Sequence, residues 1–556
     1  MRLLRSLLVL LCFASRPAGA DPARAPVVVT LVIDQLGAWV ADTRWPLLPR
    51  TGGFARLRRE GTSATLVYRH AVSDTAPGHA ALYTGATARD SGIFANERID
   101  QDSRRRVSML RDATTRILAS DGPRDLPSSS LAALKLPTLA DALRRAHPRA
   151  TIVSLSLKDR AALFGGGRAP TAALWFDASL GRFVTSTAVA RTFPVWALPL
   201  VGPDFLRTQL GRVWTAIDRP FVAAHAATPD AQPGEGDLDG IGVTFPHALA
   251  SATDPAHAFR ATPFADEILL ALALAAVDAR DAREPMLLAL SLSANDYIGH
   301  VFGPDSWEAW DELLRLDRAL ADFCAALDAR LGPRGWSLLL SADHGVVTMP
   351  EAGALARPWC KSDTPDRWRR PCGELGRIRP DELADELRVV ARRAVGDGDW
   401  IAGVADPYVT LTDGARALDE ERQRRLHQAL TVALQARVGV AAVYDARTPP
   451  PRCPDTDTVD ALVCRSLVDG APGELYVALR PGWFFDPDYV VGKGSSHGSA
   501  YLYDRAVPLV VRAPGRVAAG RVVDAPLDPA AFAATAARLF AIAPPSHARA
   551  GRDLTR

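Results

Sequence analysis

Lysine is scarce in this sequence: only four of the 65 basic residues are lysine, and the rest are arginine. Cysteine, with 6 residues, and methionine, with 4, are also rare among the 556 residues. Positive and negative charges nearly cancel, since the formal net charge at pH 7 is +2. This balance argues against a nucleic-acid-binding surface and against a polybasic membrane-binding patch.

Long apolar runs are absent as well, apart from a short one near the start. Arg2 and Arg5 precede the apolar residues 7–14, and small residues follow at 18–20. This pattern is typical of a signal peptide, whose apolar run is too short to span a membrane. We predict a signal peptide over residues 1–20 and a mature protein that is periplasmic or secreted, with no membrane span. A short membrane anchor is the alternative.

The few cysteines do not have the spacing of a zinc finger, so any bound metal must use oxygen and nitrogen ligands. Cys360 and Cys372 flank a charged, loop-like segment, and so do Cys453 and Cys464. In an oxidising compartment these pairs predict two local disulfides. Cys324 lies in a helical pattern and is expected to be a buried thiol.

Several apolar runs of strand length end close to an aspartate. They are residues 26–33 before Asp34, 286–292 before Asp296, and 337–340 before Asp343. Helical patterns lie between these runs at 264–281 and 307–331, and a further one follows at 529–540. Together these patterns predict an α/β fold with a largely parallel central sheet flanked by helices on both faces. Ligands bind beyond the carboxyl ends of such strands, so we expect the three aspartates to converge on one site.

The character of the chain changes between residues 351 and 489. Its patterns predict helices and strands near 381–395, 407–411, 418–438, 440–444 and 474–479. We therefore expect a smaller α/β lobe at 351–489, inserted into a main domain formed by 21–350 and 490–556. A second, less regular insertion is expected at about 161–263, which is rich in proline, glycine and aromatic residues.

Residues 73–82 predict a turn that opens a helix. Pro77 suits the first helical turn, and the free N–H groups of a helix start can bind an anion. Thr75 is placed to present its hydroxyl to a phosphate bound there, although an ordinary threonine near an N-cap is the alternative. His79, one turn into the helix, is expected to pack or to support a metal ligand rather than to bind a metal itself.

Six aspartates and histidines lie in short motifs, several of them at predicted strand ends: Asp34, Asp296, His300, Asp343, His344 and His497. Asp296 and His300 are four residues apart, close enough to bind one metal ion. His497 lies in a loop rich in glycine and serine, which lets backbone approach a ligand. Asp and His ligands without thiolates are typical of a catalytic zinc site, although any single histidine here would equally suit the core or the surface.

One of the four lysines, Lys158, lies two residues before Arg160 and follows a predicted strand at 150–153. A compact ammonium beside a forked guanidinium is well suited to bind a phosphoryl dianion. A solvated charge cluster on a loop is the alternative.

In these motifs and their order, the chain resembles the alkaline phosphatase superfamily. Within it, the chain is similar to the type I phosphodiesterase/nucleotide pyrophosphatase clan, and there to the threonine-nucleophile (PafA-like) alkaline phosphatases. The resemblance runs from Val27 to about Pro508 and implies an alkaline phosphatase-like fold with two zinc ions per chain. It assigns the first zinc to Asp34, Asp343 and His344 with Thr75 as the attacking residue, and the second to Asp296, His300 and His497. It also implies that Asn96, Lys158 and Arg160 contact the phosphate.

The resemblance implies an exported alkaline phosphatase that hydrolyses small-molecule phosphate monoesters through a phosphothreonine at Thr75. The sulfatases of the superfamily require an arginine at the position of His79. Nucleotide phosphodiesterases share the zinc ligands but lack the Lys158/Arg160 pair, so a phosphodiesterase is the alternative. A metal-stabilised binding protein without turnover is a third hypothesis. The natural substrate, the oligomeric state and the roles of Asp74, His79 and Lys493 stay open.

Overall fold

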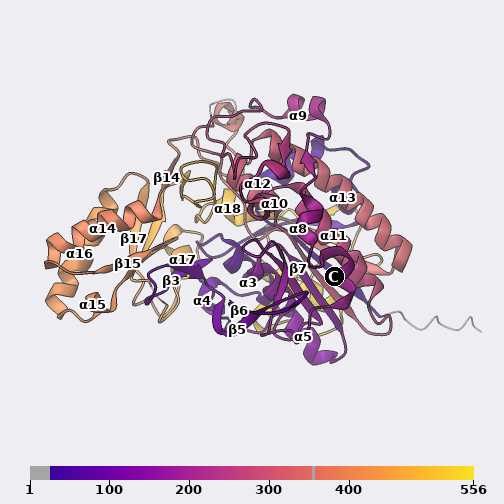
Figure 1. Cartoon of the computed structure of the whole chain (residues 1–556), viewed down its shortest axis with the longest axis horizontal. Helices are drawn as coiled ribbons and strands as arrows, with labels where there is room; N and C mark the ends of the chain where they lie inside the picture. The colour runs from indigo at the N-terminus through magenta and orange to yellow at the C-terminus, as the bar shows by residue number, and fades with distance from the viewer. Residues whose placement is uncertain (1–24, 353–356, 472, 556) are drawn as a thin grey trace, which may run out of the picture.

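The computed structural model describes residues 25–352, 357–471 and 473–555 (Figure 1). The predicted signal peptide, residues 1–20, lies outside them. None of the helices in the described ranges combines the length and the apolar character needed to cross a membrane.

A mixed sheet of 11 strands forms the centre of the described structure. In spatial order the strands are β21 (Arg521–Val522), β2 (Thr62–Val67), β20 (Ala506–Arg512), β13 (Trp336–Ser341), β1 (Val27–Ile33), β12 (Met286–Leu292), β7 (Thr151–Ser156), β8 (Ala172–Asp177), β9 (Arg182–Ser186), β5 (Arg111–Ala119) and β6 (Gly122–Ser129). The five strands from β13 to β8 pair in parallel. Most of the outer strands pair antiparallel. The predicted α/β fold is confirmed, and its sheet is parallel in the middle and mixed at the edges.

The central strands are mostly apolar because helices cover the sheet. Every residue of β1 and β12 is buried. One group of helices that pack together consists of α3 (Thr75–Thr84), α6 (Asp159–Gly166) and α19 (Ala530–Leu539). Another consists of α2 (Gly53–Glu60), α11 (Pro263–Asp278), α12 (Ala294–Phe302) and α13 (Trp307–Leu331). Strands buried on both faces do not alternate in polarity, which is why the sequence shows continuous apolar runs.

Two strands of the central sheet, β8 and β9, lie inside the segment 161–263 that the sequence predicted to be irregular. The rest of that segment contains short helices: α7 (Leu198–Val201), α8 (Phe205–Gln209), α9 (Arg219–His225) and α10 (Pro255–Arg260). Phe176, Phe183, Phe205 and Phe259 pack together with ring centroids 5.3–6.1 Å apart. The aromatic residues of this segment therefore form a core that joins its helices to β8 and β9. The hairpin β5–β6 was not predicted either.

A four-stranded sheet lies to one side of the molecule, in orange at the left of Figure 1. Its strands are β15 (Ile401–Ala405), β16 (Tyr408–Leu411), β18 (Leu475–Leu479) and β17 (Val440–Asp445), and its helices are α14 (Pro380–Val395) and α16 (Glu420–Ala436). The sequence predicted all of these except β15. Leucines of α14 and α16 pack on this sheet in a hydrophobic cluster of their own. Whether 351–489 is a separate domain stays a prediction.

Both predicted disulfides are present, Cys360–Cys372 and Cys453–Cys464. Cys324 is a buried free thiol in α13, as the sequence predicted.

Candidate active site

Three aspartates gather at the carboxyl end of the central sheet. Strand β1 lies between β12 and β13, and all three strands are parallel. Asp34 follows β1 directly, Asp343 comes two residues after β13, and Asp296 lies in the first turn of α12 after β12. All three carboxylates are buried. Acids that are scattered through the sequence therefore converge on one edge of the sheet, as expected for an α/β fold.

Three buried histidines direct the same ring nitrogen at these acids. In each ring Nδ1 lies near a backbone carbonyl: His300 near Ser495 O (2.8 Å), His344 near Gly345 O (3.0 Å) and His497 near Ser73 O (2.9 Å). Because a carbonyl oxygen only accepts, Nδ1 carries the proton of each hydrogen bond. Nε2 then faces a carboxylate oxygen, at 3.2 Å for His300–Asp296, 3.3 Å for His344–Asp34 and 3.6 Å for His497–Asp296. Metal-binding histidines are held in this way.

The possible ligand atoms form two groups, and within each group all atoms lie within 4.8 Å of one another. One group is Asp296, His300 and His497, and the other is Asp34, Asp296 and His344. Asp343 lies beside the second group, with Oδ2 3.5 Å from His344 Nε2. The buried carboxylate oxygens face nitrogen atoms: Asp34 Oδ2 lies 2.6 Å from Lys158 Nζ, and Asp343 Oδ2 lies 3.1 Å from His79 Nδ1. Buried carboxylates that gather this closely are costly unless positive charge is near. Their oxygen and nitrogen atoms therefore fit bound divalent metal ions.

The cluster stabilises positive charge. Burial by itself lowers the pKa of a cationic side chain, because the charge loses its hydration. At Lys158 the carboxylates of Asp296 and Asp34 outweigh burial and raise the pKa above its ordinary value. At His497 hydrogen bonds with Asp296 and Asp74 likewise outweigh burial and raise the pKa well above its ordinary value. A metal ion would meet the same favourable field.

Thr75 is the first residue of α3 and is fully buried among these groups. Its Oγ1 lies 3.2 Å from Lys158 Nζ and 3.5 Å from His344 Nε2. The helix approaches Asp343 closely because residue 78 is glycine: a Cβ at Gly78 would lie 2.3 Å from Asp343 O. The positive end of the α3 dipole also favours an anion at this position.

Asn96, Lys158 and Arg160 reach the same place. Asn96 Oδ1 accepts a hydrogen bond from the backbone N–H of Ala76 (2.8 Å), which leaves the Nδ2 side of the amide to donate elsewhere. Lys158 Nζ lies 2.6 Å from Asp34 Oδ2. Within the described ranges, the buried Nε of Arg160 has no hydrogen-bond partner. These three side chains present donors to whatever binds at Thr75.

One cleft, of about 980 Å³ and partly open to solvent, is lined by Thr75, Asn96, Lys158, Arg160, His300 and His497. Its lining also includes Pro380, Asp406 and Tyr489 from the segment 351–489, Arg260 from α10 and Tyr297 from α12. The site is thus a cleft at the edge of the central sheet, bounded on one side by the segment 351–489.

Several residues of the site were not predicted from the sequence. Gln35 donates from its backbone N–H to Asp343 Oδ1 (3.2 Å) and from Nε2 to Asp296 Oδ1 (3.0 Å). Asp74, whose role the sequence left open, lies 3.0 Å from His497 Nδ1. Gln35 directly follows Asp34, and Asp74 directly precedes Thr75. These neighbouring positions are the signals by which the sequence could have pointed to them. His79 lies under Thr75, with Nδ1 2.9 Å from Thr75 O and 3.1 Å from Asp343 Oδ2.

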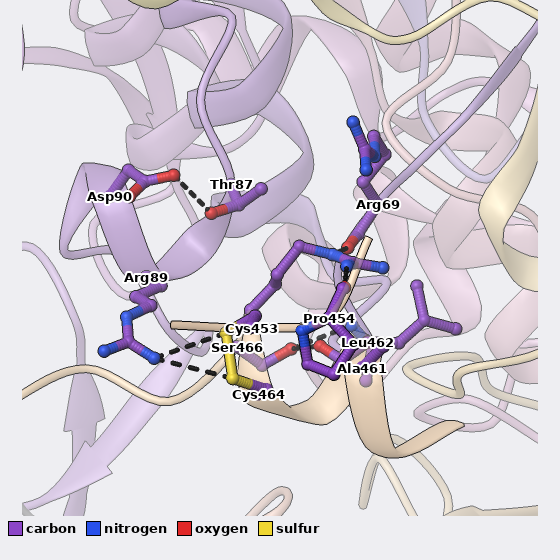
Figure 2. The surroundings of a disulfide bond; sticks show 12 residues. Arg69, Thr87, Arg89, Asp90, Cys453, Pro454, Ala461, Leu462, Cys464 and Ser466 are labelled. Carbon is purple, nitrogen blue, oxygen red and sulfur yellow. Dashed lines mark hydrogen bonds between the residues drawn. A yellow bond between two sulfur atoms is a disulfide. The ribbon is translucent and has the colours of Figure 1, made fainter. Parts of the chain in front are cut away.

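The disulfide Cys453–Cys464 holds a loop against the segment that leads to Thr75 (Figure 2). The backbone N–H of Ala71 donates to Ser466 Oγ (2.8 Å), and Arg465 donates through Nε to Arg69 O. Arg89 Nη1 lies 3.3 Å from Cys453 Sγ, as Figure 2 shows. Residues 69–71 therefore depend on this loop for their position, four residues before Thr75.

Replacing Cys453 and Cys464 by serine is expected to raise amide hydrogen exchange in residues 69–75, because the loop that holds them loses its cross-link. It should also destabilise the fold by about 2–4 kcal/mol. The control is the double serine variant of Cys360 and Cys372, which closes a loop of similar length, 12 against 11 residues. An increase in exchange at 69–75 in both variants, or in neither, would contradict this prediction.

Comparisons with known proteins agree with this arrangement. Residues 28–395 match the family described as type I phosphodiesterase/nucleotide pyrophosphatase. The chain is 33% identical to alkaline phosphatase PhoV of Synechococcus elongatus over 342 residues, which is 59% of this chain and 60% of that protein. It is 32% identical to alkaline phosphatase PafA of Elizabethkingia meningoseptica over 345 residues, or 58% of this chain and 60% of PafA. These two matches thus span about 60% of the length of each relative.

The crystal structure of wild-type PafA resembles the whole molecule, with a TM-score of 0.79 and 25% identity over 96% of this chain and 99% of PafA. The family match covers both β1 with Asp34 and the segments that carry Thr75, Asp296 and Asp343. By sequence and by fold, the chain belongs to the type I phosphodiesterase/nucleotide pyrophosphatase family.

Proposed function

We propose that this protein is an exported alkaline phosphatase that hydrolyses phosphate monoesters with two zinc ions and Thr75 as the nucleophile. The observation that carries the proposal is the position of Thr75 Oγ1 at a helix N-terminus, 3.2 Å from Lys158 Nζ and 3.5 Å from His344 Nε2. The similarity to proteins named alkaline phosphatases supports it. Export rests on the predicted signal peptide.

We assign the metal ligands in two sets. Asp34, Asp343 and His344 hold one zinc beside Thr75, and Asp296, His300 and His497 hold the other. Zinc is favoured because the donors are imidazole nitrogens and a few carboxylate oxygens, whereas calcium and magnesium prefer oxygen ligands alone. Gln35 would orient Asp296 and Asp343 through its two hydrogen bonds.

When bound, two zinc ions supply Lewis acidity that lowers the pKa of a nearby hydroxyl and stabilises charge on a departing oxygen. Thr75 loses its hydroxyl proton and Oγ forms a bond to phosphorus, while the ester oxygen leaves with the bonding electrons and takes up a proton to give the free alcohol. Water then attacks phosphorus, the bond from phosphorus to Thr75 Oγ breaks, and a proton from the water restores the hydroxyl as inorganic phosphate is released. Asn96, Lys158 and Arg160 donate to the non-bridging oxygens, where charge must be stabilised in the transition state.

The cationic pair favours a monoester over a diester. A monoester has two negative charges on its non-bridging oxygens, whereas a diester has one charge and a second substituent. The ammonium of Lys158 and the guanidinium of Arg160 line the cleft together with Thr75. A monoester offers three non-bridging oxygens to the N–H donors of this pair, whereas a diester offers two. A phosphodiesterase remains the second candidate because the family includes such enzymes.

Protein purified without chelator is expected to contain about two zinc ions per chain and to hydrolyse 4-nitrophenyl phosphate faster than methyl 4-nitrophenyl phosphate. EDTA should abolish both activities, and zinc should restore them, because the Asp and His side chains alone do not activate Thr75. Elemental analysis and release of nitrophenol give the two measurements.

The two parts of this proposal fail separately. Full activity in a preparation with one metal ion or none would exclude the two-metal site. Faster hydrolysis of the diester at full zinc content would favour the phosphodiesterase. No hydrolysis of either ester by the zinc-loaded protein would leave a metal-stabilised binding protein.

A further inference from the structure

Two arginines line the cleft without a place in the proposed chemistry, Arg106 and Arg260, and Arg106 is paired with Asp488 (2.6 Å). Arg260 is the last residue of α10, in the segment predicted to be irregular. Its guanidinium carbon lies 4.7 Å from the centre of the Tyr297 ring, and Nη1 lies 3.4 Å from Tyr297 Oη. Within the described part of the chain it forms no ion pair with a carboxylate, and its buried Nε has no hydrogen-bond partner. A buried donor without a partner is costly, so Arg260 is prepared for an acceptor that the chain itself does not provide.

Arg260 lies where the cleft meets a second groove. This groove encloses about 720 Å³ and is open to solvent. Lys158, Arg160, Tyr297 and Arg260 line both the cleft and the groove. The cleft and the groove therefore adjoin at these side chains, next to the place where a phosphate would lie beside Thr75.

Besides Arg260 and Tyr297, the groove is lined by residues of β5 and β6, by residues 157–160, and by the end of β8 with the turn after it. Two carboxylates lie there, and both are engaged by neighbouring donors. Asp159 Oδ1 accepts from the backbone N–H of Arg160 (2.8 Å), and Asp177 Oδ1 accepts from the backbone N–H of Leu180 (3.1 Å). Arg160 meets Asp159 only at 3.8 Å. Lys158, Arg160 and Arg260 outnumber these two carboxylates in the lining of the groove, so its formal charge is positive.

We propose that Arg260 is a specificity-determining residue that binds a second negative group on the leaving-group side of the substrate. The inference rests on the proposed phosphatase function and narrows its substrates to monoesters whose alcohol carries a carboxylate or a further phosphate. A guanidinium against a tyrosine ring is held in one orientation, so its fork of N–H donors is preorganised for such an oxyanion. Lys158 and Arg160 act on the transferred phosphoryl group, whereas Arg260 acts on the group beyond it.

The test uses three phenyl phosphates that differ only in the group at the 3-position of the ring. This group is a carbamoyl group, a carboxylate or a second phosphate. The carbamoyl compound is the neutral reference. For Arg260→Gln we expect kcat/KM to fall roughly ten- to hundredfold with the charged leaving groups and to change less than about twofold with the carbamoyl compound. Arg260→Lys should restore part of the loss, because it keeps the charge without the fork. The carboxylate and phosphate arms show which anion is recognised.

Arg207→Gln is the matched control, since Arg207 is a mostly exposed arginine of the neighbouring helix α8 that pairs with Asp204. An equal loss on all three substrates in Arg260→Gln would make Arg260 structural and overturn the proposal. No effect on any substrate would overturn it too. If the wild type does not hydrolyse even the carbamoyl compound, the proposed function itself fails, and this inference fails with it.

Discussion

Replacing Thr75 by alanine is expected to lower the turnover of phosphate monoesters by roughly a thousandfold or more, as for other catalytic nucleophiles. Thr75 Oγ1 lies within 3.5 Å of both Lys158 Nζ and His344 Nε2, so no other hydroxyl takes its place without a change of backbone. The zinc content should stay nearly unchanged, because the aspartates and histidines hold the metal. Steady-state kinetics with 4-nitrophenyl phosphate and elemental analysis measure the two quantities.

Two further variants make this test specific. Thr75→Ser keeps a hydroxyl and should retain part of the activity. Thr84→Ala removes a hydroxyl from the same helix that donates to Ala80 O (2.6 Å) and accepts from the N–H of Ala86 (3.2 Å). It does not line the cleft, so this variant should be almost fully active. Rapid quenching of the wild type with substrate, followed by mass spectrometry, should find phosphate on Thr75. Substantial turnover by Thr75→Ala would point to direct attack by water.

The sequence predicted that the three aspartates meet at one site, and this prediction did not require knowledge of the order of the strands in the sheet. The apolar runs before Asp34, Asp296 and Asp343 mark buried parallel strands, and all such strands present their carboxyl ends to one edge of a sheet. The structure adds that these strands are immediate neighbours. Cysteine spacing predicted both disulfides for a similar reason, since short loops bring their ends together at low entropic cost.

Other parts of the site carry no local signal. Gln35 has a left-handed backbone with φ of 68° and forms hydrogen bonds with Asp343 and Asp296. A glutamine in a sequence predicts neither this backbone conformation nor these contacts. Arg260 and Tyr297 meet only because the segment before α11 folds over α12. That segment was predicted to be irregular because its strands are short and its helices have four to seven residues. Periodicity is detectable in long elements and is lost in short ones.

Replacing both Lys158 and Arg160 by alanine is expected to lower kcat/KM for a phosphate monoester by roughly 10²–10⁴-fold, since each charge-assisted contact contributes about 1.5–3 kcal/mol. Hydrolysis of the matched methyl diester should fall far less. The reason is differential binding: the pair stabilises the charge that only the monoester carries in its transition state. Measuring kcat/KM on 4-nitrophenyl phosphate and methyl 4-nitrophenyl phosphate gives the ratio directly.

Lys158 requires a control of its own, because its Nζ lies 2.6 Å from Asp34 Oδ2 and 2.5 Å from Asp296 Oδ2, among the proposed metal ligands. Its loss removes a positive charge from the cluster, so the zinc content of each variant must be measured with its kinetics. Arg160→Ala separates the two effects, since Arg160 pairs only with Asp159, at 3.8 Å, in the described structure. Arg145→Ala, an exposed arginine at the end of the helix at Leu139–Ala146, is the charge-matched control. If Arg160→Ala retains full zinc and loses only monoesterase activity, the guanidinium acts on the substrate. An equal loss of both activities in Arg160→Ala would mean that the pair is structural, and the phosphodiesterase would become the better reading of this site.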